Sequence, residues 1–223
     1  MSTELFVIAE VMTGKLNDLV KSIMQQTGTN DPNEAIRLVE SGDWIVSKLT
    51  VIYLSVKSDG TTGPDWEKWF DKNNYNLSLD ERFILNSSDF KPTKKGTIHN
   101  IAVLKGMFFE GGDRITENIR AKAYAGTYAG TFIQNQKLLD PNAEVACLIR
   151  KKLSDKEIEA MGFWRIVVMH EPIKNSVGFP CLLSADCGRG GRLLNAWSGM
   201  PDFGWHRNCG FAFVVSQEAS SQS

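Results

Sequence analysis

The stretch LLSADCGRGGRLLN, residues 182–195, places a glycine-rich turn between two apolar runs of strand length. Because glycine adopts the positive-φ conformations that tight turns need, the stretch predicts a β-hairpin. A phosphate-binding loop would lead from a strand into a helix, and the residues that follow, LLNAWSG, form a poor helix. An RNA contact of the RGG type through Arg189 and Arg192 is a weaker alternative, because the motif occurs here as one short instance between two strands.

The hairpin belongs to a series of four apolar runs in the C-terminal part of the chain. These runs are FWRIVVMHEP (163–172), PCLLSAD (180–186), RLLNAW (192–197) and CGFAFVVSQ (209–217). Segments rich in turn-forming residues separate them, which is typical of consecutive antiparallel strands. In the last run Phe211, Phe213 and Val215 alternate with smaller residues, so we expect one bulky face that packs on helices. The pattern predicts a contiguous antiparallel meander over residues 163–217.

Amphipathic segments near the N-terminus predict two helices. Residues 14–28 and 31–42 each end on a glycine, and Pro32 suits the first turn of the second helix. We expect the two helices to form a hairpin that packs on a strand predicted over 44–56, because they cannot bury enough apolar surface alone. A helix-turn-helix DNA-binding motif is a weaker alternative, since the second segment carries only Arg37 as a cation.

Helix and strand signals continue through the middle of the chain. Ser78 with Glu81, and Ser154 with Glu157, match the capping box that begins a helix. The run IHNIAVLKGMFF, residues 98–109, has the apolar centre of a strand. The whole pattern predicts an α+β fold, with an N-terminal helical hairpin and central helices packed on a largely antiparallel sheet that ends in a four-stranded meander.

Length and composition fit one large domain or two small ones. The chain has 223 residues, of which 42% are hydrophobic and 23% charged, as in ordinary soluble folded proteins. We expect an acidic region over 1–90 and a basic, sheet-rich region over 91–223, packed together as one unit. Apolar runs stay shorter than the roughly 18 residues of a membrane span, and the N-terminal run contains Glu4 and Glu10. We therefore expect a cytoplasmic protein that does not contact a membrane.

The four cysteines, Cys147, Cys181, Cys187 and Cys209, lack the spacing of a disulfide framework or of a zinc module. We therefore expect reduced thiols, no metal and no cofactor. A zinc site that gathers Cys181, Cys187 and Cys209 with His206 is a weaker alternative, because it depends on proximity in the folded chain.

Cys187 is also the nucleophile of an alternative, enzymatic interpretation. A thiol beside Arg189 and Arg192 could have a lowered pKa, and His206 is the nearest candidate base. His170 is the second candidate, although His170 and its neighbour Glu171 before a proline are more typical of a surface turn. The metalloprotease pattern H-E-x-x-H is missing from the sequence. A cysteine-dependent enzyme that uses Cys187 and His206 is thus the alternative function.

Two pairs of tryptophans, Trp66 with Trp69 and Trp197 with Trp205, have aromatic faces that could stack on a sugar or a base. Aromatic residues in short elements more often pack in a core. We expect that structural role for both pairs.

The net charge of −1 hides a gradient along the chain. Residues 1–90 hold 8 Lys and Arg against 14 Asp and Glu, a balance of −6, whereas residues 91–139 hold 8 against 3, a balance of +5. Clustered cations bind phosphates by releasing condensed counterions, so the basic middle could contact a nucleic acid or an acidic protein. An ordinary solvated surface is the alternative. The candidate anion-binding residues are Lys91, Lys94, Lys95, Lys105, Arg114 and Lys122, with Arg120 on another side of its helix.

Three segments carry a resemblance to other sequences: DPNEAIRLVESGDW (31–44), NAEVACLIRKKLSDKEIEAMGFWRIVVMHEPI (142–173) and GFAFVV (210–215). Through them the chain resembles an uncharacterised family of hypothetical bacterial proteins. The resemblance implies a coherent folded unit over most of the chain and implies no activity, ligand or site residue. The main functional prediction is therefore a non-enzymatic binding or accessory protein that contacts an anionic partner through the basic region 91–125.

Overall fold

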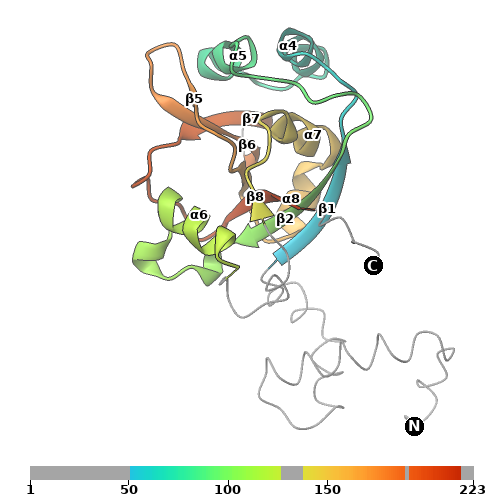
Figure 1. Cartoon of the computed structure of the whole chain (residues 1–223). Helices are drawn as coiled ribbons and strands as arrows, with labels where there is room; N and C mark the ends of the chain where they lie inside the picture. The colour runs from blue at the N-terminus through green and yellow to red at the C-terminus, as the bar shows by residue number, and fades with distance from the viewer. Residues whose placement is uncertain (1–50, 127–137, 189–190, 217–223) are drawn as a thin grey trace, which may run out of the picture. The chain divides into compact units, whose positions relative to one another are not determined.

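The computed structural model describes residues 51–126, 138–188 and 191–216 (Figure 1). The described residues belong to one compact unit, so the segment 51–90 lies in the same body as the described sheet-rich remainder. The helices predicted over 14–28 and 31–42 lie outside the described residues, as does the first part of the strand predicted over 44–56.

One mixed sheet forms the centre of this unit. Its strands follow the order β1-β2-β8-β4-β6-β5, while β7 also pairs with β6 and the short β3 pairs with β8. The strands are β1 (Val51–Lys57), β2 (Ile98–Lys105), β3 (Leu138–Leu139), β4 (Arg165–Val168), β5 (Ile173–Lys174), β6 (Pro180–Gly188), β7 (Gly191–Ser198) and β8 (Cys209–Val215). The pairings are antiparallel except for β4 with β8, which run parallel. The predicted α+β class is confirmed.

The glycine-rich stretch forms the predicted hairpin. Strands β6 and β7 are paired neighbours, with Asp186 opposite Leu193 and Gly188 opposite Gly191. The predicted meander is wrong in one connection, because β8 inserts between β2 and β4 instead of following β7. Phe211, Ala212 and Phe213 are all fully buried, and a strand that is apolar on both faces belongs in the centre of a sheet rather than at its edge.

The outer edge of β7 is covered from another part of the chain. Glu81 on α5 accepts a hydrogen bond from the backbone N–H of Ala196 at 2.7 Å. Asn76 forms an isolated parallel bridge with Leu193. Because these contacts occupy the edge that a following meander strand would need, they explain why β8 pairs elsewhere.

Helices cover the two faces of the sheet unequally. They are α4 (Gly63–Lys72), α5 (Leu79–Leu85), α6 (Thr116–Tyr124), α7 (Glu144–Lys152) and α8 (Asp155–Ala160), with short 3₁₀ turns η1 (Gly106–Phe108) and η2 (Gly111–Asp113). Buried side chains of α4, α5, α7 and α8 share one hydrophobic cluster with the sheet, and those of α6 share the other. Figure 1 shows α6 well apart from α4, α5 and α7. The capping boxes predicted at Ser78 and Ser154 begin α5 and α8.

Helix α7 is buried around most of its circumference. Its residues 144–150 are all buried, including the two charged side chains Glu144 and Arg150. A helix that is buried all round needs partners on opposite sides, and α7 lies between the sheet and α4 in Figure 1. Lys151, just beyond the buried part, lies 5.3 Å from the ring centre of Trp66 on α4. Lys152 donates to the carbonyl of Ser55 at 2.6 Å, so the C-terminal end of α7 contacts both α4 and β1.

In the described part of the chain, none of the helices has the length and apolar character that a membrane crossing requires.

Candidate anion-binding sites

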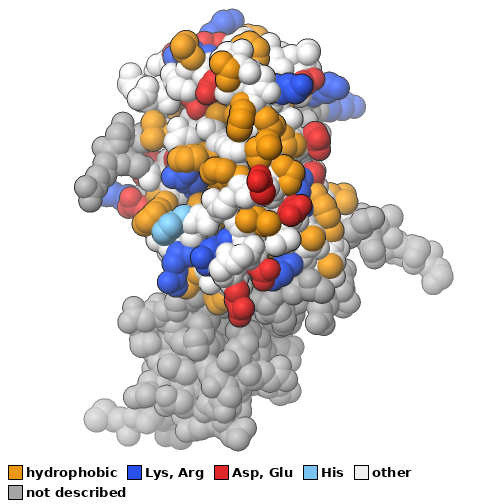
Figure 2. Space-filling model, turned by 90° about the vertical axis from the view of Figure 1, so that its left-hand side faces the viewer, with side chains coloured by type: hydrophobic (Ala, Val, Ile, Leu, Met, Phe, Trp, Pro, Cys, Tyr) orange, Lys and Arg blue, Asp and Glu red, His pale blue; other side chains and the backbone are white. Residues whose placement is uncertain are grey.

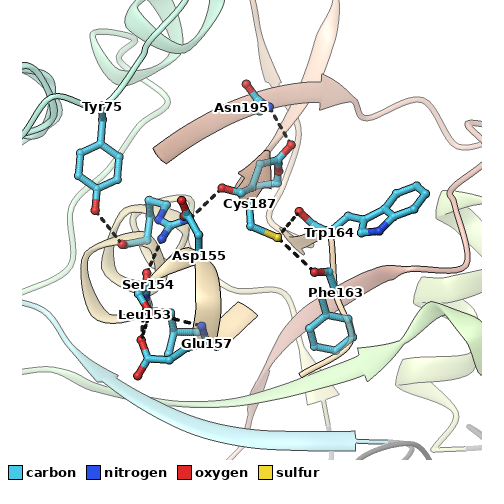
Figure 3. Close-up of polar contacts among 12 residues, drawn as sticks. Tyr75, Leu153, Ser154, Asp155, Glu157, Phe163, Trp164, Cys187 and Asn195 are labelled. Carbon is cyan, nitrogen blue, oxygen red and sulfur yellow. Dashed lines mark hydrogen bonds and ion pairs between the residues drawn. The ribbon is translucent and has the colours of Figure 1, made fainter. Parts of the chain in front are cut away.

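The thiol of Cys187 contacts the backbone where α8 leads into β4. Its Sγ lies 3.2 Å from the carbonyl oxygen of Phe163 and 3.1 Å from that of Trp164 (Figure 3). Burial raises the pKa of Cys187 to about 11, and the carboxylates of Glu159 and Asp155 add to this rise. A protonated thiol that donates to backbone carbonyls is a structural group, and the arrangement does not favour the nucleophile of the alternative prediction.

The two histidines proposed as partners of Cys187 have other environments. The exposed ring of His206 stacks on Trp164 with ring centres 4.2 Å apart, and its Nδ1 accepts a hydrogen bond from the backbone of Asn208. His170 is buried, so the predicted surface turn at this position is wrong. Its Nε2 accepts the backbone N–H of Leu183 at 2.9 Å, which leaves Nδ1–H to donate to Glu171 O at 2.6 Å. Both ring nitrogens of His170 therefore form hydrogen bonds with the backbone, and neither is free to act as a base for Cys187.

The four cysteines are free thiols, and Cys147, Cys181 and Cys209 are buried. Within residues 51–126, 138–188 and 191–216, no three His, Cys, Asp or Glu side chains converge to hold a metal ion. The zinc alternative at Cys181, Cys187, His206 and Cys209 therefore gains no support from the described residues.

The six predicted anion-binding residues fall into two groups. Lys91, Lys94 and Lys95 are exposed in the loop that leads into β2. Lys105 is the last residue of this eight-residue strand, which spans roughly 26 Å at about 3.3 Å per residue, and Arg114 and Lys122 follow it in the chain. The structure therefore does not bring the six cations together on one face.

The second group is occupied by internal contacts. Lys105 is buried, with its ammonium 5.9 Å from the ring centre of Phe163, and burial lowers its pKa. Arg114 donates to the carbonyl of Phe109 at 3.0 Å. Lys122 forms an ion pair with Asp113. Arg120, set apart in the sequence prediction, pairs with Asp140 and donates to the carbonyl of His170. These side chains are used to hold the fold.

Lys94 and Lys95 of the first group lie near three lysines from other parts of the chain, which the charge balance of residues 91–139 does not include. Gly96, with φ +92°, allows the Lys94–Thr97 turn, in which Thr97 N–H and Oγ1–H both donate to Lys94 O. Gly96 N–H also donates to Ser58 O at 2.8 Å, which fixes the turn beside the end of β1. We call the resulting exposed cluster the basic corner. It consists of Lys57, Lys94, Lys95, Lys151 and Lys152.

A buried carboxylate fixes the backbone that carries the lysines of the basic corner. Glu144, fully buried at the start of α7, accepts hydrogen bonds from Ser58 Oγ at 2.8 Å and from Thr93 N–H at 2.7 Å. It also accepts Thr93 Oγ1–H at 2.5 Å, and that oxygen in turn contacts His99 Nε2 at 3.2 Å. The loop that carries Lys94 and Lys95 is therefore tied to β1 and α7 by interactions far apart in the sequence.

Two adjoining grooves run along β1 at the basic corner. The first, of about 390 Å³, has Val56, Ile98 and Leu148 among its apolar walls. Lys57, Lys151 and Lys152 line the same groove. The second, of about 410 Å³, is lined by Tyr53, Leu54, Asn100, Ile101 and Val215, and Ser55 lines both grooves.

Existing partners leave part of the positive charge available. Lys151 pairs with Asp59 at 3.0 Å, and Lys152 donates to the outward-facing carbonyl of Ser55 at 2.6 Å. Lys57, Lys94 and Lys95 make no side-chain hydrogen bond or ion pair with the described residues. The ring of Tyr53, 51% exposed, lies at the second groove. Together these groups offer positive charge at one groove and an aromatic face at the next.

The tryptophans take different roles. Trp66 is fully buried in a group of rings with Trp69, as expected for core packing. Trp205 is buried and donates its Nε1–H to Thr116 Oγ1 at 3.0 Å. Trp197 is only partly buried, and the Arg165 guanidinium carbon lies 3.8 Å from its ring centre. Its aromatic face is thus used by an arginine of the same chain.

No protein-family model, curated protein or solved structure matches this chain.

Proposed function

We propose that this chain is a non-enzymatic binding protein whose basic corner contacts an anionic partner, and that this partner is a single-stranded nucleic acid. The observation that carries the proposal is a groove lined by three exposed lysines, Lys57, Lys151 and Lys152, which shares Ser55 with a second groove that has an exposed tyrosine. Two more exposed lysines lie in the Lys94–Thr97 turn beside the end of β1. Lysines can follow a phosphate backbone while an aromatic ring stacks on a base, and this combination suits single strands without sequence preference.

The shape of the surface favours a single strand over a duplex. The described lysines line one edge of the sheet and the end of α7, and no helix of the described residues projects from the basic corner as a reader of the major groove would. Tyr53, Ser55 and Lys57 occupy every second position of β1, so their side chains lie on the same face of the strand. A base stacked on Tyr53 and a phosphate bound by Lys57 would therefore follow one another along β1.

The proposal predicts a measurable dependence on salt. With five phosphate contacts, the binding constant should fall roughly 100-fold between about 50 and about 200 mM salt, because each contact with a single strand contributes a logarithmic slope of about 0.7. Anisotropy of a fluorescently labelled oligothymidine, titrated with the full chain at both salt concentrations, measures this dependence.

Charge reversals locate the site. The double variant Lys94→Glu, Lys95→Glu should bind more weakly and should reduce the salt slope by about 1.4, the share of two phosphate contacts. The matched control is Lys174→Glu with Arg207→Glu, which changes the net charge equally at two exposed positions away from β1. Equal effects of the two double variants, or no binding at low salt, would refute the proposal. Binding of polyglutamate in place of the oligonucleotide would instead identify an acidic protein partner.

A further inference from the structure

A second group of polar side chains lies across β4, β6 and β7, away from the edge strand β1. We call it the Arg165 cluster; its members are Arg165, Ser184, Asp186, Asn195 and Trp197. Figure 2 shows the side of the molecule that lies to the left in Figure 1, where hydrophobic side chains gather in the middle with basic side chains and a histidine among them.

The cluster is built around a buried carboxylate. Asp186 is 3% exposed, and its Oδ1 accepts the hydroxyl of Ser184 at 2.5 Å. Its Oδ2 accepts the side-chain amide of Asn195 at 2.7 Å. Neutral donors therefore satisfy both oxygens of Asp186, and neither depends on Arg165.

Arg165 lies over Trp197 and approaches Asp186 most closely through its Nε. Its nearest approach to the carboxylate is through Nε at 3.5 Å, and its guanidinium lies over the Trp197 ring at 3.8 Å. An arginine that served only to neutralise Asp186 would present its two-pronged edge to the carboxylate. The terminal amino groups of Arg165 instead make no hydrogen bond to the described residues, and its side chain remains 21% exposed.

Two N–H groups in this cluster also lack a hydrogen bond with good geometry to the described residues. Arg165 Nε, whose nearest acceptor is Asp186 Oδ2 at 3.5 Å, and Trp197 Nε1 are both buried, and neither makes a hydrogen bond with the described residues. Most buried donors in folded proteins have a hydrogen-bond partner, so two such groups in one cluster are an unusual feature for a surface that has only a structural role.

We infer that the Arg165 cluster is a binding site for an organic carboxylate. The planar guanidinium, whose terminal amino groups make no hydrogen bond to the described residues, can hold a carboxylate with two parallel hydrogen bonds beside the Trp197 ring. The buried Asp186 behind Arg165 already balances one positive charge, which favours a singly charged carboxylate over a doubly charged phosphate. The carboxylate can belong to a small organic acid or to the C-terminus of a peptide.

The indole N–H signals of the protein provide a direct test. The chain has six tryptophans, and the variant Trp197→Phe identifies the signal of Trp197 in a ¹⁵N-correlated spectrum. Titration with benzoate at millimolar concentration should shift this signal in a saturable manner. Inorganic phosphate at the same ionic strength should not. A short peptide with a free C-terminus, compared with its amidated form, separates the two sources of carboxylate.

Variants distinguish binding from a structural role. Arg165→Lys keeps the positive charge near Asp186 but loses the two-pronged geometry, so the affinity for benzoate should fall about tenfold while the spectrum stays dispersed. Arg207→Gln, at an exposed arginine outside the cluster, should leave the titration unchanged. The inference is wrong if benzoate gives no saturable shift of Trp197, if phosphate gives the same shift, or if Arg165→Lys binds benzoate as the unaltered chain does.

Discussion

Acidification should destabilise this protein through His170. The side chain is buried, its Nε2 accepts the N–H of Leu183, and its Nδ1–H donates to the carbonyl of Glu171. Burial is the main cause that lowers the pKa of His170 to about 4, and the nearby charge of Arg120 acts in the same direction. The Glu171 carbonyl opposes this shift without cancelling it.

The magnitude follows from the two protonation equilibria. In the unfolded chain His170 takes up a proton near its ordinary pKa of 6.5, whereas the folded state resists it until about pH 4. The unfolded state therefore binds more protons as the pH falls below 6.5, and the stability present above that value is progressively lost. The expected loss is about 2 kcal/mol at pH 5 and about 3 kcal/mol at pH 4, at 1.36 kcal/mol per pKa unit.

Urea unfolding of the unaltered chain and of His170→Gln, at several pH values from 7 to 4, isolates this effect. Glutamine can still accept the Leu183 N–H but does not titrate, so the difference in unfolding free energy between the two proteins should shrink by about 2 kcal/mol between pH 7 and pH 5. His99, whose pKa burial also lowers, contributes equally to both proteins and cancels. A difference that stays constant with pH would refute the assignment of His170 as a buried neutral group.

Two further predictions concern the groups around the basic corner and the hairpin. Replacing Glu144 with Ala leaves the Ser58 hydroxyl and the Thr93 N–H and hydroxyl without their acceptor, so the unfolding free energy should fall by about 3–5 kcal/mol, against about 1–2 kcal/mol for Glu144→Gln. Urea unfolding at pH 7 measures both variants, and a loss below about 1 kcal/mol for Glu144→Ala would contradict the contacts described. Cys187, with its pKa raised to about 11 from an ordinary 9.0, should be alkylated by iodoacetamide at pH 8 roughly 100-fold more slowly than in the unfolded chain. Mass spectrometry of the modified peptide measures this rate, and faster alkylation in the folded chain would favour the alternative cysteine-dependent enzyme.

Local sequence patterns predicted the elements better than their arrangement. The hairpin of β6 and β7 followed from glycines between two apolar runs, and the capping boxes at Ser78 and Ser154 follow from interactions within four residues. The position of β8 depends on which strand is buried on both faces. The alternation of Phe211 and Phe213 with smaller residues suggested a single buried face, and the apolar character of Ala212 and Val214 was the available signal for a central strand.

The candidate sites were harder to predict, because their residues come from distant segments. Lys57 lies in the acidic part of the sequence, and Lys151 and Lys152 lie in a segment of balanced charge, so a count along the chain could not place them beside Lys94 and Lys95. No signal in the sequence indicated that two polar side chains would be buried. His170 and Asp186 have the residue types of turns and surfaces, and only packing of β4, β6 and β7 shows that both are enclosed.

The central claim is that an anionic strand binds at the basic corner, and chemical-shift mapping tests it most directly. Backbone amide signals of the full chain are followed while a short oligothymidine is added at low salt. The largest shifts should fall on β1, on the Lys94–Thr97 turn and on the C-terminal end of α7, where Ser55, Lys57 and Lys151 line the first groove. Shifts confined to α6 or to the β5–β6 connection, or no shifts at all, would contradict a binding site at the basic corner.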